Sequence, residues 1–481
     1  MLRPVMLLGT LSFAVGSASC QEKTSRAAEP SRRAPFVAPR TVGPIASAVP
    51  EAPKPSVQVE PASEHGWVYA KTRFVWIYPD TSTKFQWIGY LWTGGAVRLR
   101  SARRIYAKGC EPGWSAIEPR GFVCADGIRA TLDPHDPAYV AVKQLAGNLD
   151  SPWPHAYGET TGGKAYPGFP LGEMNDPLRL PFLSSSIHDP YEVLPRRSAV
   201  AFVREFHAAN RDWLLTADLR WLPKSDVTPY PKSEFEGVQL GGKAQLPIAF
   251  FRTQARPKYR RKPTGGFEPT GDAWPRLGHV ALTAERVTEG DAVYIKVAGE
   301  SVFVRETDAV IPENRKLTPW GAPVGEPDTT GLAPKGRATW IEASIRGGWL
   351  IAYEGTKPVF TTLMSAGRGG PPVGNKPLLK TASTPLGSFP VSGKFATATL
   401  ANDVVIHSAV PWTQNFAGPY ALHTAYWHDE FGDLKSGGCL NLSPKDARYL
   451  FGFTEPPLPE GWHGVRWVPK QGPATVVYVI K

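Results

Sequence analysis

Apolar residues along this chain come mostly in short runs that alternate with polar positions, which is the period of a half-buried β-strand. Phe74–Tyr78 and Trp349–Glu354 are two such runs, and turn residues separate them from their neighbours. The 49 prolines and 47 glycines among 481 residues interrupt any longer periodic segment. The pattern therefore predicts a mainly β, multidomain protein in which many short strands are joined by turns.

The C-terminal third gives the clearest individual elements. Val404–Ile406 is a continuous apolar run, from which we expect a buried strand that delivers His407. A short helix is expected after Ser443, which suits the N-cap, with Pro444 in the first turn. Gly452 is expected to end that helix.

Changes in composition divide the chain into seven segments. They are, in order, a signal peptide at 1–19, a Pro/Ala-rich tether at 20–64, a small β-barrel at 65–132, a loop-rich connector at 133–190, a β-rich accessory region at 191–311, a Pro/Gly-rich linker at 312–335 and a last β-rich domain at 336–481. The tether lacks the apolar residues that a packed core needs, so we expect an extended linker there.

The N-terminal segment indicates export. Arg3 precedes an apolar stretch that ends in small residues, as in a secretory signal, and the stretch is too short for a stable membrane span. Cleavage after Ser19 would make Cys20 the new N-terminus. That position resembles the lipid-modified cysteine of bacterial lipoproteins, so two outcomes stay open: a lipoprotein anchored to the outer membrane, or a protein secreted with Cys20 as a spare thiol.

The four cysteines fit an oxidising compartment, where unpaired thiols are a liability. Cys110 and Cys124 are close in sequence and bracket turn glycines, so we expect a disulfide between them. With Cys20 acylated, Cys439 is then the remaining free thiol. No Cys/His group has the spacing of metal ligands, and we expect neither a metal nor a cofactor.

Cys439 lies in the stretch of the chain with the most chemical potential, Ser436-Gly437-Gly438-Cys439-Leu440-Asn441. Two glycines before a cysteine suit a tight turn in which the backbone amides of Gly437, Gly438 and Cys439 converge on an oxyanion. A cysteine nucleophile also needs a base, and His423 lies sixteen residues upstream in an apolar run. His407 is the rival base. A packed, unreactive cysteine is the ordinary alternative.

These residues resemble the signature of the L,D-transpeptidases, cell-wall enzymes in which a histidine, a spacer and Ser/Thr-His-Gly-Cys-x-Asn follow one another. His423, Ser436, Gly438, Cys439 and Asn441 match the signature, whereas Gly437 stands where the family has histidine. Further upstream, Thr384-Pro385-Leu386-Gly387-Ser388-Phe389 looks like the family's Thr-Pro-x-Gly-x-Phe segment. The strand spacing at 65–132 is similar to a bacterial Src-homology-3-like (SH3-like) barrel.

The resemblance implies a β-sandwich or barrel catalytic domain with a short helix at 336–481, preceded by SH3-like barrel modules. It implies that Cys439 attacks a peptidoglycan stem peptide and that His423 removes the thiol proton. The other implied roles are secondary: Gly437, Gly438, Ser436 and Asn441 form the oxyanion site and the turn, Thr424 orients His423 through its carbonyl, and Tyr420, Trp427 and Phe431 line the donor cleft or the core.

Two further functions stay open. An L,D-carboxypeptidase would use the same residues with water as the acceptor, and a non-catalytic wall-binding protein would explain Gly437 as a loss of chemistry. The net charge of +11 favours an anionic partner. The basic residues are scattered rather than gathered in one patch with aromatics, so we expect binding to the cell envelope and not to nucleic acid. The sequence does not indicate an oligomeric state.

Overall fold

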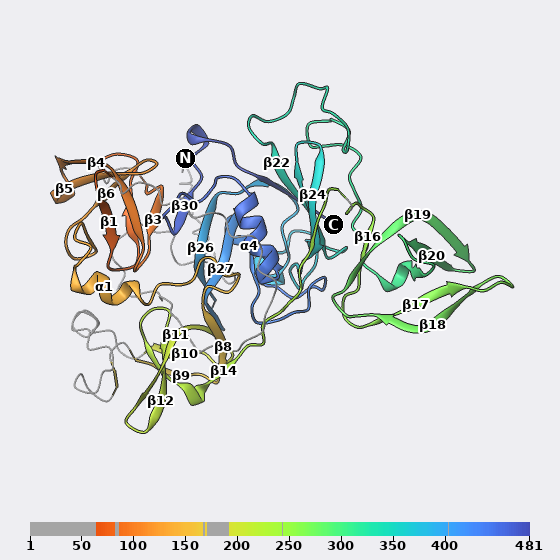
Figure 1. Cartoon of the computed structure of the whole chain (residues 1–481), viewed down its shortest axis with the longest axis horizontal. Helices are drawn as coiled ribbons and strands as arrows, with labels where there is room; N and C mark the ends of the chain where they lie inside the picture. The colour runs from red at the N-terminus through yellow and green to blue at the C-terminus, as the bar shows by residue number, and fades with distance from the viewer. Residues whose placement is uncertain (1–63, 82–85, 167–168, 171–191, 243, 403) are drawn as a thin grey trace, which may run out of the picture.

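The computed structural model describes residues 64–81, 86–166, 169–170, 192–242, 244–402 and 404–481. The expected signal peptide, the tether and Cys20 lie outside these residues. The described chain is mainly β and consists of several sheets, as the alternating pattern predicts. Figure 1 shows a central body with one lobe at each end of the long axis and a third beneath it. None of the described helices is long and apolar enough to span a membrane.

The lobe at one end holds the first strands of the chain. Its sheet has the order β6-β5-β4-β1-β7. The strands are β1 (Trp67–Ala70), β4 (Ala96–Ala107), β5 (Cys110–Ile117), β6 (Phe122–Cys124) and β7 (Ala130–Thr131). A disulfide joins Cys110 to Cys124 at its edge. Helix α1 (Pro137–Lys143) follows, in a segment that the sequence predicts to be loop-rich. The signal was present, because Asp136 caps the helix and a proline begins it.

A twelve-stranded sheet runs through the middle of the molecule and joins segments that are far apart in sequence. Its main path is β13-β12-β11-β27-β26-β30-β3-β2, and β8, β14, β28 and β29 pair beside it. The bounds are β2 (Val75–Ile77), β3 (Gly89–Leu91), β8 (Ala156–Thr160), β11 (Ala199–Ala208), β12 (Arg211–Thr216), β13 (Trp221–Pro223), β14 (Val227–Pro229), β26 (Gly393–Ala401), β27 (Ile406–Ala417), β28 (Tyr420–Thr424), β29 (Leu440–Leu442) and β30 (Gly464–Arg466). A two-stranded sheet of β9 (Gly163–Ala165) and β10 (Glu192–Leu194) lies in the lobe beneath.

Part of this sheet packs on a second, six-stranded sheet to form the C-terminal domain. The second sheet has the order β15-β24-β23-β22-β31-β25. Its strands are β15 (Val238–Gln239), β22 (Thr339–Ser344), β23 (Trp349–Glu354), β24 (Lys357–Leu363), β25 (Gly387–Pro390) and β31 (Val476–Ile480). The shared core contains Ile341 and Leu350 from this sheet, Leu422 and Leu440 from the other, and Leu450 from helix α4 (Pro444–Phe453).

Helix α4 is built as the sequence predicts at its start but not at its end. The Ser443 hydroxyl accepts the amide hydrogen of Asp446 at 3.1 Å, and Pro444 occupies the first turn. The helix continues past Gly452 to Phe453, where the Lys394 ammonium donates to the carbonyls of Phe451 and Thr454 at 2.6 and 2.7 Å. This buried cation satisfies carbonyls that a glycine cap would otherwise serve.

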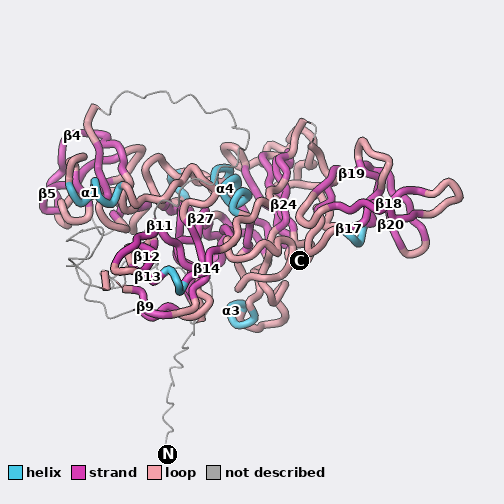
Figure 2. The backbone as a smooth tube through the Cα atoms, turned by 60° about the horizontal axis from the view of Figure 1, so that its bottom comes forward, coloured by secondary structure: helices cyan, strands magenta, loops and turns pink. Residues whose placement is uncertain are grey.

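A lobe at the other end contains residues 248–305 and has its own sheet, β16-β19-β20-β21-β17-β18. The strands are β16 (Ile248–Phe250), β17 (Arg256–Arg261), β18 (Phe267–Trp274), β19 (His279–Glu289), β20 (Ala292–Val297) and β21 (Phe303–Arg305). We call this the accessory lobe. Figure 2 shows it from a second direction, together with the short helix α3 (Leu378–Thr381).

Candidate functional site

The turn around Cys439 is fixed by its own serine. The Ser436 hydroxyl donates to the carbonyl oxygen of Cys439 at 2.6 Å and accepts the amide hydrogen of Gly438 at 2.9 Å. The Gly438 amide is therefore occupied by a hydroxyl in this conformation. For the Gly438 amide to join an oxyanion site, as the glycine-rich turn predicts, the serine would have to release it or share it.

Two motifs that are far apart in sequence meet at this turn. The Thr384 hydroxyl, from the Thr-Pro-x-Gly-x-Phe segment, accepts the amide hydrogen of Gly367 at 2.8 Å and donates to the carbonyl of Gly438 at 2.9 Å. Thr384 is fully buried, so both hydrogen bonds are shielded from water. The motif threonine thus attaches the cysteine turn to a neighbouring loop.

Gly438 and Gly437 differ in their need for glycine. Gly438 has a φ of +132°, and a Cβ there would lie 2.4 Å from a ring carbon of Tyr420 and 3.0 Å from the carbonyl of Ser383. Gly437 does not have a positive φ and is only partly buried. The position at which the chain departs from the family signature is therefore free of the conformational demand that Gly438 carries.

The pairing of β28 with β29 sets His423 beside the cysteine turn. The two strands are parallel, and His423 lies opposite Asn441. Leu422, Leu440 and Leu442 all face the domain core, so the alternation puts His423 and Asn441 on the other face. Cys439 is two residues before Asn441 and shares its parity. One face of this strand pair therefore packs in the core, and the other carries His423, Asn441 and Cys439.

His423 is held in one tautomer. Its Nδ1 lies 2.8 Å from the carbonyl oxygen of Thr424, and a carbonyl can only accept, so Nδ1 carries the hydrogen. Nε2 is then the nitrogen with the free electron pair. Burial lowers the pKa of His423 to about 4, an effect that the Thr424 carbonyl partly offsets, and the ring is neutral at physiological pH. A neutral imidazole with an available nitrogen can accept a thiol proton.

The rival histidine, His407, has a different environment. Its ring stacks on Trp427 at 3.9 Å between centroids, whereas the centroid of His423 is 5.8 Å from that indole. Burial lowers the pKa of His407 to about 3. The strand predicted at Val404–Ile406 begins only at Ile406, and Val404 is 72% exposed, so the prediction of a buried run was wrong there. His407 instead sits where β27 meets β11, opposite Ala199.

A third histidine, which the sequence analysis did not select, completes this cluster. Nδ1 of His428 accepts the amide hydrogen of Glu430 at 3.2 Å, so Nε2 carries the hydrogen of the neutral ring. Nε2 lies 3.0 Å from the side-chain amide of Asn441 and donates to it when the amide oxygen faces the ring. Burial lowers the pKa of His428 to about 4. His428 follows Trp427 directly in the sequence, but its contact with Asn441 is seen only in the structure. Asn441 therefore connects the cysteine turn to His428.

The remaining selected aromatics are largely structural. Phe431 is buried, stacks on Phe235 at 5.5 Å and belongs to a core cluster with Phe250. Tyr420 is 5% exposed and packs its ring against Gly438. Trp427 is partly buried between the two histidine rings.

Cys439 is not part of a disulfide, and its side chain is fully buried. Its sulfur lies 3.9 Å from the carbonyl oxygen of Pro419, in the turn between β27 and β28. Gly418 in the same turn is exposed. The sulfur is therefore shielded in this conformation, with a surface turn as a near neighbour. Across the described part of the chain, no cluster of three His, Cys, Asp or Glu residues has a geometry that could hold a metal ion.

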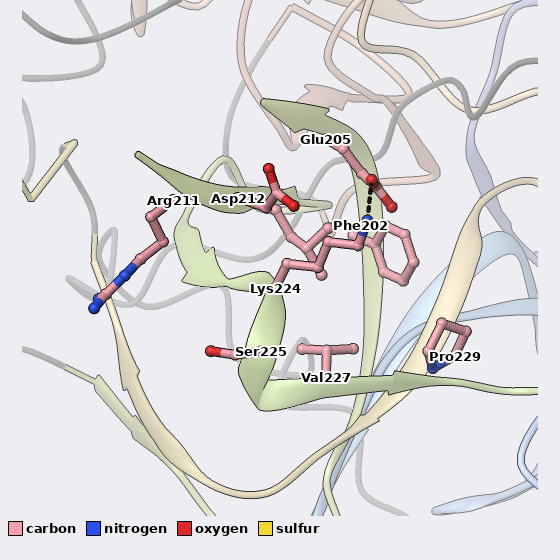
Figure 3. Close-up of a pocket in the computed structure, with 9 residues that line it drawn as sticks. Phe202, Glu205, Arg211, Asp212, Lys224, Ser225, Val227 and Pro229 are labelled. Atoms are coloured by element: carbon pink, nitrogen blue, oxygen red, sulfur yellow. Dashed lines mark hydrogen bonds and ion pairs between the residues drawn. The ribbon is translucent and has the colours of Figure 1, made fainter. Parts of the chain in front are cut away.

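An open cavity of about 460 Å³ lies elsewhere, among β11, β12 and the residues after β13. Figure 3 shows its charged rim, where the Lys224 ammonium pairs with Glu205 at 2.6 Å. His207 and Asp212 form a second pair there at 2.8 Å. None of the residues selected from the sequence lines this cavity.

Comparison with known proteins finds a family that is similar to the C-terminal domain. Residues 338–479 match the profile of the L,D-transpeptidase catalytic domain (YkuD) family. This match supports a transpeptidase-like function and covers the cysteine turn and all three clustered histidines. No similar sequence was found among curated proteins.

Solved L,D-transpeptidases are similar to part of the chain. A variant of the Enterococcus faecium enzyme is 22% identical over 30% of this chain and 49% of its own, with a TM-score of 0.22. The enzyme from Stackebrandtia nassauensis is 20% identical over 31% of this chain and 57% of its own, with a TM-score of 0.21. A Mycobacterium tuberculosis enzyme with a faropenem-derived adduct is 15% identical over 47% and 78%, with a TM-score of 0.23. The chain thus spans about half the length of the first two.

Proposed function

We propose that this protein is a peptidoglycan L,D-transpeptidase that acts through a thioester on Cys439. The observation that supports this most is the parallel pairing of β28 and β29, which sets a neutral, tautomerically defined His423 on the same face as the cysteine turn. A nucleophile, its base and the group that orients the base are the three parts that cysteine acyl transfer requires.

In the proposed reaction, Nε2 of His423 takes the Cys439 proton as the sulfur attacks the carbonyl carbon after an L-centred residue of a stem peptide. The carbonyl π bond becomes an oxyanion, which the Gly437 and Cys439 amides stabilise. Collapse of this intermediate breaks the C–N bond, and the leaving D-amino acid takes the proton from His423. An amine of a second stem then attacks the thioester and restores the thiol.

The fully buried sulfur requires the site to open before a peptide can enter. Its contact with Pro419, beside the exposed Gly418, supports the turn between β27 and β28 as the access route of this proposal. The same burial favours the second candidate, a non-catalytic wall-binding protein in which Cys439 is only a packed thiol. An L,D-carboxypeptidase would share the acylation step and differ only in its acceptor.

Acylation by imipenem separates an acyl-transfer enzyme from the non-catalytic candidate, because a β-lactam reports the first half of the reaction without an acceptor. Product analysis with purified stem peptides then separates the transpeptidase from the carboxypeptidase. The purified chain is expected to gain the mass of one imipenem, on the peptide that contains Cys439. Cys439→Ala is expected to gain none, and His423→Gln to react far more slowly, whereas the matched change at the rival, His407→Gln, should leave the rate near that of the wild type. An unmodified wild-type chain that still binds isolated cell wall would establish the non-catalytic alternative.

The setting of the enzyme is part of the proposal. Export with a lipidated Cys20 would hold the domain near the wall, and an SH3-like N-terminal lobe would bind it. Cell fractionation of the wild type and of Cys20→Ser tests the anchor, since loss of the acylated cysteine should release the protein from the membrane fraction. An unchanged distribution would contradict it.

A further inference from the structure

The loop between the candidate base and the nucleophile is held from outside its own domain. We call residues 425–435 the intermotif loop. The accessory lobe contributes Arg276, whose guanidinium donates two hydrogen bonds to the Asp429 carboxylate, both at 2.8 Å, and a third to the Asp429 carbonyl at 2.9 Å. A second arginine, Arg252, donates to the carbonyl of Gly432 at 2.6 Å and lies 3.7 Å from the Asp433 carboxylate.

These contacts complement the charge of the loop. Asp429, Glu430 and Asp433 outnumber Lys435, the lysine of the loop, which pairs with Glu430 at 2.6 Å. The two other carboxylates meet Arg276 and Arg252 of the accessory lobe. The Arg276 guanidinium holds the pKa of the Asp429 carboxyl below its usual range. A bidentate arginine fork fixes orientation as well as distance, which a single surface ion pair does not.

Hydrogen bonds within the intermotif loop connect these arginine contacts to the face that carries His423 and Asn441. Asp429 is adjacent to Glu430, whose amide donates to Nδ1 of His428 at 3.2 Å. His428 contacts Asn441 at 3.0 Å, and Asn441 lies opposite His423 and two residues beyond Cys439. The Ser365 hydroxyl donates to the Glu430 carbonyl at 2.8 Å, so the segment is fixed from two sides.

We propose that Arg276 and Arg252 are positioning residues: from the accessory lobe they fix the intermotif loop so that His428 holds Asn441, and with it the cysteine turn, in register with His423. The proposal rests on the proposed function, because it concerns the reactivity of the same thiol. It gives the accessory lobe a role in the reaction without contact with the substrate. Loops are otherwise the most mobile part of a fold, and a small misplacement of reacting groups is costly.

The test measures Cys439 acylation by imipenem in the full chain, separating the maximal rate from the concentration for half-maximal rate. Arg276→Ala is expected to lower the maximal rate about 10-fold, with little change in half-saturation. Arg276→Lys should recover part of the loss, since lysine supplies the charge without the fork. Arg260→Ala is the matched control: it breaks an equally short ion pair of the same lobe, with Glu268 at 2.8 Å, away from the loop.

Exchanging the charges of Arg276 and Asp429 distinguishes loss of their ion pair from general misfolding of the variants. Asp429→Arg alone should be slow, and the double variant Arg276→Asp with Asp429→Arg should regain rate because the pair is rebuilt in reverse. The positioning role is overturned if Arg276→Ala and Arg260→Ala are acylated equally fast. It is also overturned if Arg276→Ala is acylated faster than the wild type, because the arginine contacts would then keep the site closed. A wild type that does not react at all refutes the proposed function instead.

Discussion

The two glycines of the cysteine turn make opposite predictions for the same substitution. Gly438→Ala adds a Cβ at 2.4 Å from the Tyr420 ring and 3.0 Å from a backbone carbonyl, at a φ of +132°. The backbone conformation costs about 1–3 kcal/mol for a residue with a side chain. The overpacking costs about 1–3 kcal/mol more, because a carbonyl and a packed ring cannot both move aside.

The expected loss for Gly438→Ala is therefore about 2–6 kcal/mol. Gly437→Ala should cost less than Gly438→Ala, because Gly437 has no positive φ and is partly exposed. Scanning calorimetry of the full chain measures both. A loss of this size lowers the midpoint of a domain-sized transition by about 4 °C or more.

A double-mutant cycle with Tyr420→Ala divides the loss into its two parts. Removing the ring relieves the side-chain clash, so Gly438→Ala should cost less in that background, while the backbone part remains. If Gly438→Ala and Gly437→Ala shift the midpoint equally, the conformational difference between the two glycines is refuted. If Gly438→Ala costs as much in the Tyr420→Ala background as in the wild type, the clash with the Tyr420 ring is refuted.

Three further outcomes follow from buried groups. Thr384→Val leaves the Gly367 amide and the Gly438 carbonyl unpaired, so it should cost about 2–5 kcal/mol of stability and slow acylation by imipenem. Thr361→Val is the control: it removes one hydrogen bond remote from the site, to the Leu350 carbonyl at 3.1 Å. It should cost less and leave acylation unchanged. Replacing both Cys110 and Cys124 by alanine should destabilise the N-terminal lobe by about 3 kcal/mol through lost loop constraint, measured by calorimetry. Acid titration should destabilise the fold, because burial lowers the pKa of His155, His407 and His463 to about 3 and that of His423 and His428 to about 4. The contribution of each ring is complete above pH 6.5 and is lost as pH falls toward its lowered pKa, at about 1.4 kcal/mol per pH unit for each ring.

Several elements of the C-terminal domain could be predicted from local patterns of residues. The Ser443 cap and the strand at Trp349–Glu354 depend on near neighbours, and the structure contains both. The end of helix α4 and the start of β27 depend on distant partners. Lys394 serves the helix carbonyls from another strand, and Ser198 pairs with the amide of Ile406 at 3.0 Å. The residues adjacent to these two boundaries do not indicate that Lys394 and Ser198 are their partners.

The same distinction applies to the candidate site. His423 and Cys439 could be selected because each lies in a recognisable local pattern. His428 could not, because its significance comes from Asn441, thirteen residues away, and from a parallel pairing that sequence alone does not specify. The contact of the accessory lobe with the loop could not be predicted either, since Arg276 and Asp429 are separated by 153 positions in the sequence.

The connection across that distance changes how the departure at Gly437 is understood. A histidine at Gly437 would add a polar ring beside the thiol, but in this chain His428 already lies on the Asn441 side of the turn and is held by a loop that a separate lobe grips. If His428 supplies the polar group that the signature histidine gives elsewhere, Gly437→His should add little to the imipenem rate of the wild type. It should restore much more in His428→Ala. Equal gains in both backgrounds would show that the two rings act independently.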